Sequence, residues 1–138
     1  MTSIATLGSH CALQVLKGAK DEGFKTILVC EKKREKLYRR FKFIDEIILV
    51  DSFSEILTDE CQNKLAENDA ILIPHGTLIA QMSSDEIESI KTPVFGNKWI
   101  LRWESDRVMK EKMMLESNLN VPKSITSPKD INKLVIAK

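Results

Sequence analysis

Two short segments of the chain combine glycine, a hydroxyl side chain and histidine. One reads TLGSH over residues 6–10, and the other reads IPHGT over residues 73–77. Glycine lets the backbone approach a ligand, hydroxyl and amide groups donate hydrogen bonds to phosphate oxygens, and an imidazole adds a hydrogen bond or a charge. Such segments suit the binding of a phosphorylated ligand. The candidate binding residues are Gly8, Ser9, His10, His75, Gly76 and Thr77.

A structural role would explain the same residues equally well. Ser9 and Thr77 would then cap helices, and the two histidines, the only ones in the chain, would bond loop carbonyls. Neither segment has the three glycines of the dinucleotide-binding pattern, and the Gly-Lys-Ser/Thr motif of P-loops is absent from the sequence. Asp51 follows a predicted strand and could bind a ribose hydroxyl, although opening a turn or capping a helix is the commoner role.

Residues 31–42 are rich in lysine and arginine, with Tyr38 and Phe41 among them. Basic residues interleaved with aromatic ones can bind RNA or phosphates, but a solvated face is the commoner explanation. The whole chain has a formal net charge of only +1, whereas dedicated nucleic-acid binders carry a strong basic excess. We therefore expect no nucleic-acid partner. One arginine of this segment reaching a ligand phosphate is more plausible.

Residues 95–107 form the densest polar and aromatic cluster. They include Trp99 and Trp103, for which a place in the core is favoured over stacking on a ligand base. Ser105 or Asp106 is expected to cap the helix that follows. Glu104 and Asp106 could bind a metal, but two acids without a nearby histidine are a weak metal signal. The sequence therefore predicts no metal site.

The three cysteines show no C-x-x-C spacing, which argues against a disulfide framework or a zinc site. Cys30 lies in an apolar run and is expected to be a buried thiol. Cys11 follows His10 and could be a catalytic thiol, but no nearby base or activating cluster supports that role.

The elements that must position these residues follow an alternating pattern. Apolar, β-branched runs predict strands, and stretches with apolar residues at helical spacing predict helices. Strands are expected at Ser3–Leu7, Lys25–Cys30, Glu46–Val50 and Ala70–Ile73, with a possible fifth at Thr92–Phe95 and a strand-like tail at Lys133–Ala137. Helices are expected at residues 10–22, 54–67 and 105–118, the first with Ser9 as its N-cap and Gly23 as its terminator.

This alternation predicts an α/β fold, a small doubly wound parallel sheet. Ligands bind such sheets beyond the carboxyl ends of the strands, which is where both glycine–histidine segments fall. The chain has 138 residues, about one domain, with 43% hydrophobic and 30% charged residues. That composition excludes collagen-like, coiled-coil and disordered classes. No apolar run approaches the ~20 residues of a membrane span, and no signal peptide is recognisable, so we expect a cytoplasmic protein without a membrane partner.

Several motifs in this order resemble a known family. They are TLGSH at 6–10, LKGAK at 16–20 with EGF at 22–24, RFK at 40–42, PHG at 74–76, and FGN at 95–97 with ILRWES at 100–105. Together they resemble the N-terminal region of the archaeal formate-dependent ligases that formylate aminoimidazole carboxamide ribonucleotide (AICAR) in purine biosynthesis. The resemblance covers essentially the whole chain. Residues 95–105 and the two histidine–glycine segments are specific, whereas the helices between them are generic.

The resemblance implies an ATP-grasp enzyme that joins formate to the 5-amino group of AICAR, using ATP and Mg²⁺ through a formyl phosphate. Residues 1–121 would be the substrate-binding domain that precedes the ATP-grasp fold, and residues 122–138 would be the start of that fold. His10 and Thr77 occupy the positions that contact AICAR in the family, and the strand ending at Lys138 resembles the ATP-binding strand. Thr77 replaces the family's serine and keeps its hydroxyl. Relatives assemble, so a homo-oligomer is expected at full length.

The chain departs from the family pattern by stopping at Lys138, before the glycine-rich loop and the Mg²⁺ ligands. It is therefore expected to be an inactive fragment of a longer ligase. Two alternatives stay open at this point, because a family fold does not fix the substrate. One is an ATP-grasp ligase for a different phosphorylated amine. The other is a freestanding nucleotide-binding module.

Overall fold

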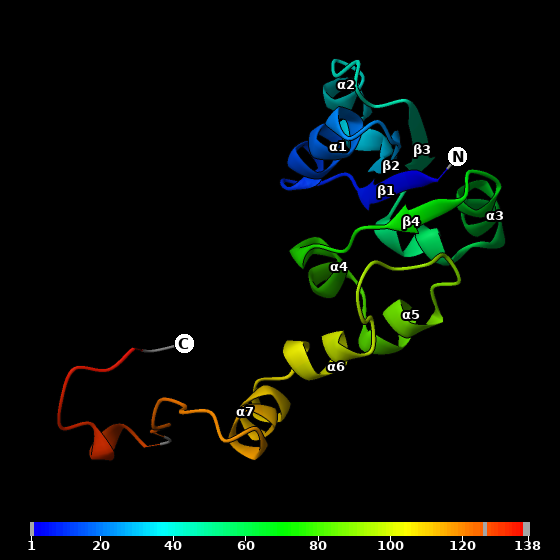
Figure 1. Ribbon diagram of the computed structural model, residues 1–138. Helices are drawn as coiled ribbons and strands as arrows, with labels where there is room; N and C mark the ends of the chain where they lie inside the picture. The colour runs from blue at the N-terminus through cyan, green and yellow to red at the C-terminus, as the bar shows by residue number, and fades with distance from the viewer. Residues whose placement is uncertain (1, 126, 137–138) are drawn as a thin grey trace.

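A four-stranded parallel sheet forms the centre of the protein in the computed structural model, which describes residues 2–125 and 127–136. The strand order is β3-β2-β1-β4, and each neighbouring pair is parallel (Figure 1). The strands are β1 (Ser3–Leu7), β2 (Lys25–Glu31), β3 (Glu46–Val50) and β4 (Ala70–Leu72). The helices are α1 (Ala12–Asp21), α2 (Glu35–Tyr38), α3 (Asp59–Glu67), α4 (Gly76–Gln81), α5 (Ser84–Ser89), α6 (Ile100–Ser105) and α7 (Arg107–Glu116).

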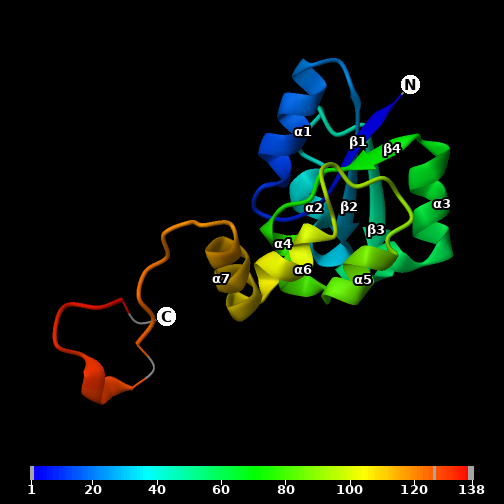
Figure 2. The same ribbon diagram turned by 60° about the horizontal axis from the view of Figure 1, so that its bottom comes forward.

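Side chains of the sheet alternate between two apolar layers. From β2, Ile27 and Val29 join the larger core cluster with Leu65 of α3, whereas Leu28 and Cys30 join the smaller cluster that contains α1 and Tyr38. Helices therefore cover both faces of the sheet, and α1 and α3 lie on opposite sides of it (Figure 2). This arrangement confirms the predicted doubly wound α/β fold. The prediction of Cys30 as a buried thiol is also confirmed.

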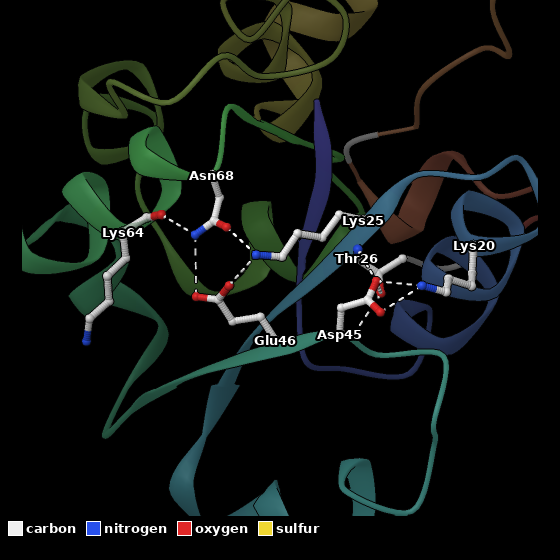
Figure 3. A network of polar contacts seen from close by, with 7 residues as sticks. All are labelled: Lys20, Lys25, Thr26, Asp45, Glu46, Lys64 and Asn68. Atoms are coloured by element: carbon white, nitrogen blue, oxygen red, sulfur yellow. Dashed lines mark hydrogen bonds and ion pairs between the residues drawn. The ribbon is translucent and has the colours of Figure 1, made fainter. Parts of the chain in front are cut away.

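Polar side chains close the amino end of the sheet (Figure 3). Lys25 donates to the carboxylate of Glu46 at 2.8 Å and to the side chain of Asn68. Beside them, the carboxylate of Asp45 accepts hydrogen bonds from the backbone N–H of Thr26 at 2.9 Å and from Lys20 at 2.7 Å. These contacts join the starts of β2 and β3 to the ends of α1 and α3. At the opposite, carboxyl end of the sheet lie the loops that follow the strands.

Several predicted boundaries are wrong for identifiable reasons. The helix expected at 54–67 is split, because Thr58 caps α3 after the separate 3₁₀ turn η2 (Phe53–Leu57). The expected fifth strand shrinks to one parallel bridge between Val94 and Leu72. Pro93 has no N–H to donate to a ladder, and Gly96 at φ +86° turns the chain away. The helix expected from residue 105 begins at Arg107 instead, with Asp106 as its N-cap, one of the two residues expected to cap it.

The chain after α6 runs away from the sheet, as both ribbon views show (Figures 1 and 2). The last regular element there is the short 3₁₀ turn η3 (Pro128–Asp130). The strand expected at Lys133–Ala137 is absent from its described part, residues 133–136, where Leu134 is 99% exposed. Ala137 lies outside the described residues. A strand needs a neighbouring strand to pair with, and this segment has none among the described residues.

Candidate functional site

A cleft of about 290 Å³ opens at the carboxyl end of the sheet. The loop after β1 contributes Ser9 and His10, and the start of α4 contributes Gly76 and Thr77. Because β1 and β4 are neighbours in the sheet, the loops that follow them meet, although they are separated by more than 60 residues in the sequence. The structure thus brings together four of the predicted site residues around one cavity.

A buried hydroxyl pair joins the two loops. Ser9 Oγ and Thr77 Oγ1 are 2.6 Å apart, and both residues are buried. Ser9 was predicted to cap α1, and that prediction is wrong. Cys11 occupies the N-cap position, and its side chain makes no capping hydrogen bond. The Ser9 hydroxyl bonds Thr77 instead of the helix.

His75 precedes Gly76 in the chain but does not line the cleft. Its Nε2 hydrogen-bonds the backbone oxygen of Leu7 at 3.0 Å, and its Nδ1 accepts from the backbone N–H of Thr77 at 3.3 Å. A carbonyl can only accept, so Nε2 carries a proton. Because Nδ1 accepts a hydrogen bond, it carries none, and the ring is neutral. Burial lowers the pKa of His75, and the nearby His10 lowers it further, while the bond to Leu7 acts in the opposite direction. His75 therefore has the structural role that the sequence left open, as the N-cap of α4.

His10 has a different environment, although its ring centroid is only 6.4 Å from that of His75. It is exposed and lines the cleft. Among the described residues, no hydrogen-bond partner is recorded for its ring. Its imidazole is therefore available to a ligand.

Packing alone requires a glycine at position 8, and its predicted contact with a ligand stays a prediction. A Cβ there would lie 3.2 Å from a ring carbon of Tyr38 and 3.3 Å from the backbone of Val29 and Cys30. The Tyr38 hydroxyl donates to Ser9 O at 2.9 Å. Gly8 thus lets the loop lie against β2 and α2, which fixes Ser9 and His10 at the mouth of the cleft.

Three charged residues line the cleft that were not among the predicted site residues. Glu31 is the last residue of β2, and Lys33 and Arg34 belong to the 3₁₀ turn η1 (Lys32–Arg34) that follows it. Lys33 Nζ lies 2.8 Å from Glu31 Oε1, and Arg34 Nε lies 3.5 Å from Glu31 Oε2. The sequence could have indicated these residues, since they follow a predicted strand whose carboxyl end was expected to lie beside the two glycine–histidine segments. Phe53, Ala80 and Gln81 complete the lining and carried no such signal.

The other candidates of the sequence are not part of this cleft. Asp51 pairs with Lys32 at 2.9 Å, and Trp99 is 58% exposed rather than in the core. Glu104 pairs with Lys110, and Asp106 accepts from the first backbone N–H groups of α7. Within the described residues no three His, Cys, Asp or Glu side chains are grouped as metal ligands would be. The remaining candidate, Lys138, lies outside the described residues.

Comparison with known proteins gives the family. Residues 4–125 match the family described as "Protein of unknown function (DUF1246)". The chain belongs to this family. Over all its 138 residues the DUF1246 chain is 75% identical to the 5-formaminoimidazole-4-carboxamide-1-(beta)-D-ribofuranosyl 5'-monophosphate synthetase of Nitrosopumilus maritimus (strain SCM1). It is 70% identical to the protein of the same name from Cenarchaeum symbiosum (strain A). In both cases it spans 40% of the relative's length.

A solved structure supports the same relationship. The DUF1246 chain is similar to an IMP biosynthesis protein PurP from Thermococcus kodakaraensis, with a TM-score of 0.76 and 32% sequence identity. The match covers 94% of this chain and 41% of that one. These similarities confirm the predicted resemblance and the α/β fold. No helix among the described residues of the DUF1246 chain is long and apolar enough to cross a membrane.

Proposed function

We propose that this DUF1246 chain is the AICAR-binding part of a ligase that formylates AICAR with formate and ATP, a reaction of purine (IMP) biosynthesis. The observation that carries the proposal is the 75% identity, over the whole chain, to a synthetase named for the formylated product. The cleft at the carboxyl end of the sheet supplies the binding site. The proposal includes the division at residues 121 and 122, a cytoplasmic location and self-association of the full-length enzyme.

The hydroxyl pair gives the cleft one donor and several acceptors. Each hydroxyl has one hydrogen and two lone pairs. Ser9 and Thr77 bond each other, so one of their two hydrogens is used between them and the other is free to reach a ligand. His10, exposed at the mouth of the cleft, adds an imidazole from the β1–α1 loop. We assign these three side chains to AICAR, with Gly76 leaving room for its approach.

Positioning is the contribution that this part of the enzyme makes to the reaction. Holding the 5-amino group in a fixed place makes its attack on an activated formyl group effectively intramolecular, which can supply several kcal/mol of the barrier. ATP, when bound, supplies the phosphoryl group that activates formate. The described residues offer no cluster of metal ligands, so we assign neither Mg²⁺ nor the triphosphate to them. We assign Lys138 to ATP from the family resemblance alone.

Calorimetric titration of the 138-residue chain with AICAR tests the binding. The wild-type chain is expected to bind. His10→Ala is expected to weaken binding about tenfold or more, because it removes a ligand hydrogen bond. Its fold should be intact, because the exposed ring makes no hydrogen bond with the described residues and its one aromatic neighbour, His75, lies 6.4 Å away between ring centroids. Asn63→Ala, an exposed change on α3 away from the cleft, is the matched control and should bind like wild type. Absence of AICAR binding, or equal affinity of His10→Ala and wild type, would reject the assignment.

A hybrid enzyme tests the ligase itself. In it, this chain replaces the matching 40% of the Nitrosopumilus maritimus relative. The hybrid is expected to form the formylated ribonucleotide only when AICAR, formate and ATP are all present. A folded hybrid that is inactive with AICAR but active with another phosphorylated amine would overturn the choice of substrate.

A further inference from the structure

One wall of the cleft carries two cations that the proposed function has not used. Lys33 and Arg34 both line the cavity, and their side chains are 68% and 43% exposed. Both follow β2, the strand next to β1, so they lie at the same sheet edge as Ser9 and His10. Their donor groups are accessible from the cavity that the nucleotide would fill.

Glu31 holds these two cations in place. Its side chain is only 12% exposed, and its two carboxylate oxygens face Lys33 and Arg34 respectively. Arg34 is tied a second time, because its Nη1 donates to the backbone oxygen of Gly8 at 3.3 Å. The guanidinium therefore spans from the end of β2 to the β1–α1 loop. A long side chain fixed at two points has already lost the rotamer freedom that binding would otherwise cost.

The charge balance of the cleft favours an anion. Lys33 and Arg34 contribute two positive charges, and Glu31 is the one carboxylate among the residues that line the cavity in the described part of the chain. Glu31 is mostly buried and turned toward its two partners, so the exposed charge of this wall is positive. Arginine has five N–H donors in a planar fork, a geometry that matches phosphate oxygens. Here one of them is hydrogen-bonded to Gly8 and another lies near Glu31.

We propose that Lys33 and Arg34, positioned by Glu31, form the subsite for the phosphate monoester of the nucleotide bound in this cleft. This inference rests on the proposed function, because it assigns one part of the proposed nucleotide-binding cleft to the phosphate and the other part to the rest of the nucleotide. The Ser9–Thr77 pair and His10 take the aminoimidazole carboxamide ribose, and the cationic wall takes its 5′-phosphate. A free phosphate ion has the same chemistry, and the experiment separates it from the nucleotide.

Titrations with AICAR and with its nucleoside, which lacks only the phosphate, test the subsite directly. The wild-type chain is expected to bind AICAR at least tenfold more tightly than the nucleoside, and inorganic phosphate more weakly than either. Arg34→Gln is expected to weaken AICAR binding about 10- to 100-fold, because hydrogen bonds between charged groups are lost. Nucleoside affinity should change less than twofold. Added salt should weaken AICAR binding more than nucleoside binding.

The chain offers matched controls for both cations. Arg39→Gln removes an arginine paired with Glu35, and Lys32→Gln removes a lysine paired with Asp51; neither residue lines the cleft. Both controls should keep the wild-type preference for AICAR. Lys33→Gln, which leaves the Arg34–Gly8 bond in place, should reduce that preference about threefold to tenfold.

Three results would overturn the subsite. The wild-type chain could bind AICAR and the nucleoside equally well, or Arg34→Gln and Lys33→Gln could both leave the preference for AICAR unchanged. Lys33→Gln could also weaken AICAR and nucleoside equally, which would show a structural effect. In all three cases AICAR still binds, so the proposed function survives. If neither AICAR nor the nucleoside binds to the wild-type chain, the proposed function itself fails and the subsite fails with it.

Discussion

Replacing His75 separates the two hydrogen bonds that its neutral ring makes. His75→Asn keeps an acceptor where Nδ1 caps α4 but cannot reach Leu7 O, whereas His75→Gln can reach Leu7 O but loses the cap. Each change is expected to lower the free energy of unfolding by about 1 kcal/mol, the usual value of a helix cap or of one hydrogen bond. His75→Ala loses both and should cost about 2 kcal/mol. For a chain of this size that lowers the melting temperature by roughly 6–8 °C.

The same ring makes stability depend on pH. Burial is the main cause of the lowered pKa of His75, so the unfolded chain takes up a proton near pH 6.5 while the folded chain still resists it. The unfolded state then binds more protons, and the free energy of unfolding falls as the pH drops below about 6.5 until the folded pKa is passed. His75→Asn and His75→Gln remove this dependence, because neither side chain titrates.

Urea unfolding followed by circular dichroism at pH 5 and pH 7.5 measures both effects. Only two histidines exist in the chain, so His10→Gln is a matched control. It removes an exposed imidazole and should keep most of the wild-type pH dependence as well as the stability at pH 7.5. If His75→Asn retains the full wild-type change between the two pH values, the neutral, doubly bonded ring is the wrong description of this residue.

Two further substitutions and one labelling experiment have definite expected outcomes. Gly8→Ala should lower the free energy of unfolding by about 1–3 kcal/mol in urea titrations, because the new methyl group meets packed atoms at 3.2–3.3 Å. Asp45→Asn should cost about 1 kcal/mol at pH 7. Burial alone would raise the pKa of Asp45, but the hydrogen bonds drawn in Figure 3 lower it below 3.8. The stabilisation by the Asp45 carboxylate is therefore lost as the pH falls through its folded pKa. Asp45→Asn cannot titrate, so the variant should show less acid destabilisation than wild type. Burial raises the pKa of Cys30 and Cys61 to about 11, so a thiol reagent at pH 8 should label the partly exposed Cys11 first and the other two only after unfolding.

The strands were predictable because their apolar, β-branched runs stand out in the sequence, even in the edge strand β3, where Leu49 is exposed. β1 and β3 have the predicted bounds, and β2 and β4 differ from the prediction by one residue each. Residues 76–105 were not predictable in the same way. Helices α4, α5 and α6 have six residues each, fewer than two turns, so their apolar side chains cannot display a helical period. They pack against the larger core cluster through Leu78 of α4, Ile87 of α5 and the partly buried Leu101 of α6.

The position of the cleft could be predicted from the sequence, but the roles of its individual residues could not. A parallel sheet brings strand ends to one edge, which was enough to group residues 8–10 with residues 75–77. Which histidine lines the cleft depends on the strand order: the placement of β4 beside β1 puts His75 against Leu7 O and leaves His10 exposed. The predicted reach of one arginine of residues 31–42 toward a ligand phosphate stays a prediction, and the structure places Arg34 on the cleft wall.

The two ends of the sheet treat their polar groups in opposite ways. At the amino end, Lys25, Asp45 and Glu46 are satisfied by protein partners, so those groups gain little from any ligand. At the carboxyl end, His10 and Arg34 line a cavity, and the protein groups in the described part of the chain do not use all of their hydrogen-bonding capacity. Since every strand of a parallel sheet starts at one edge and ends at the other, substitutions at the two ends share no partners. Their effects on stability and on binding should therefore be additive.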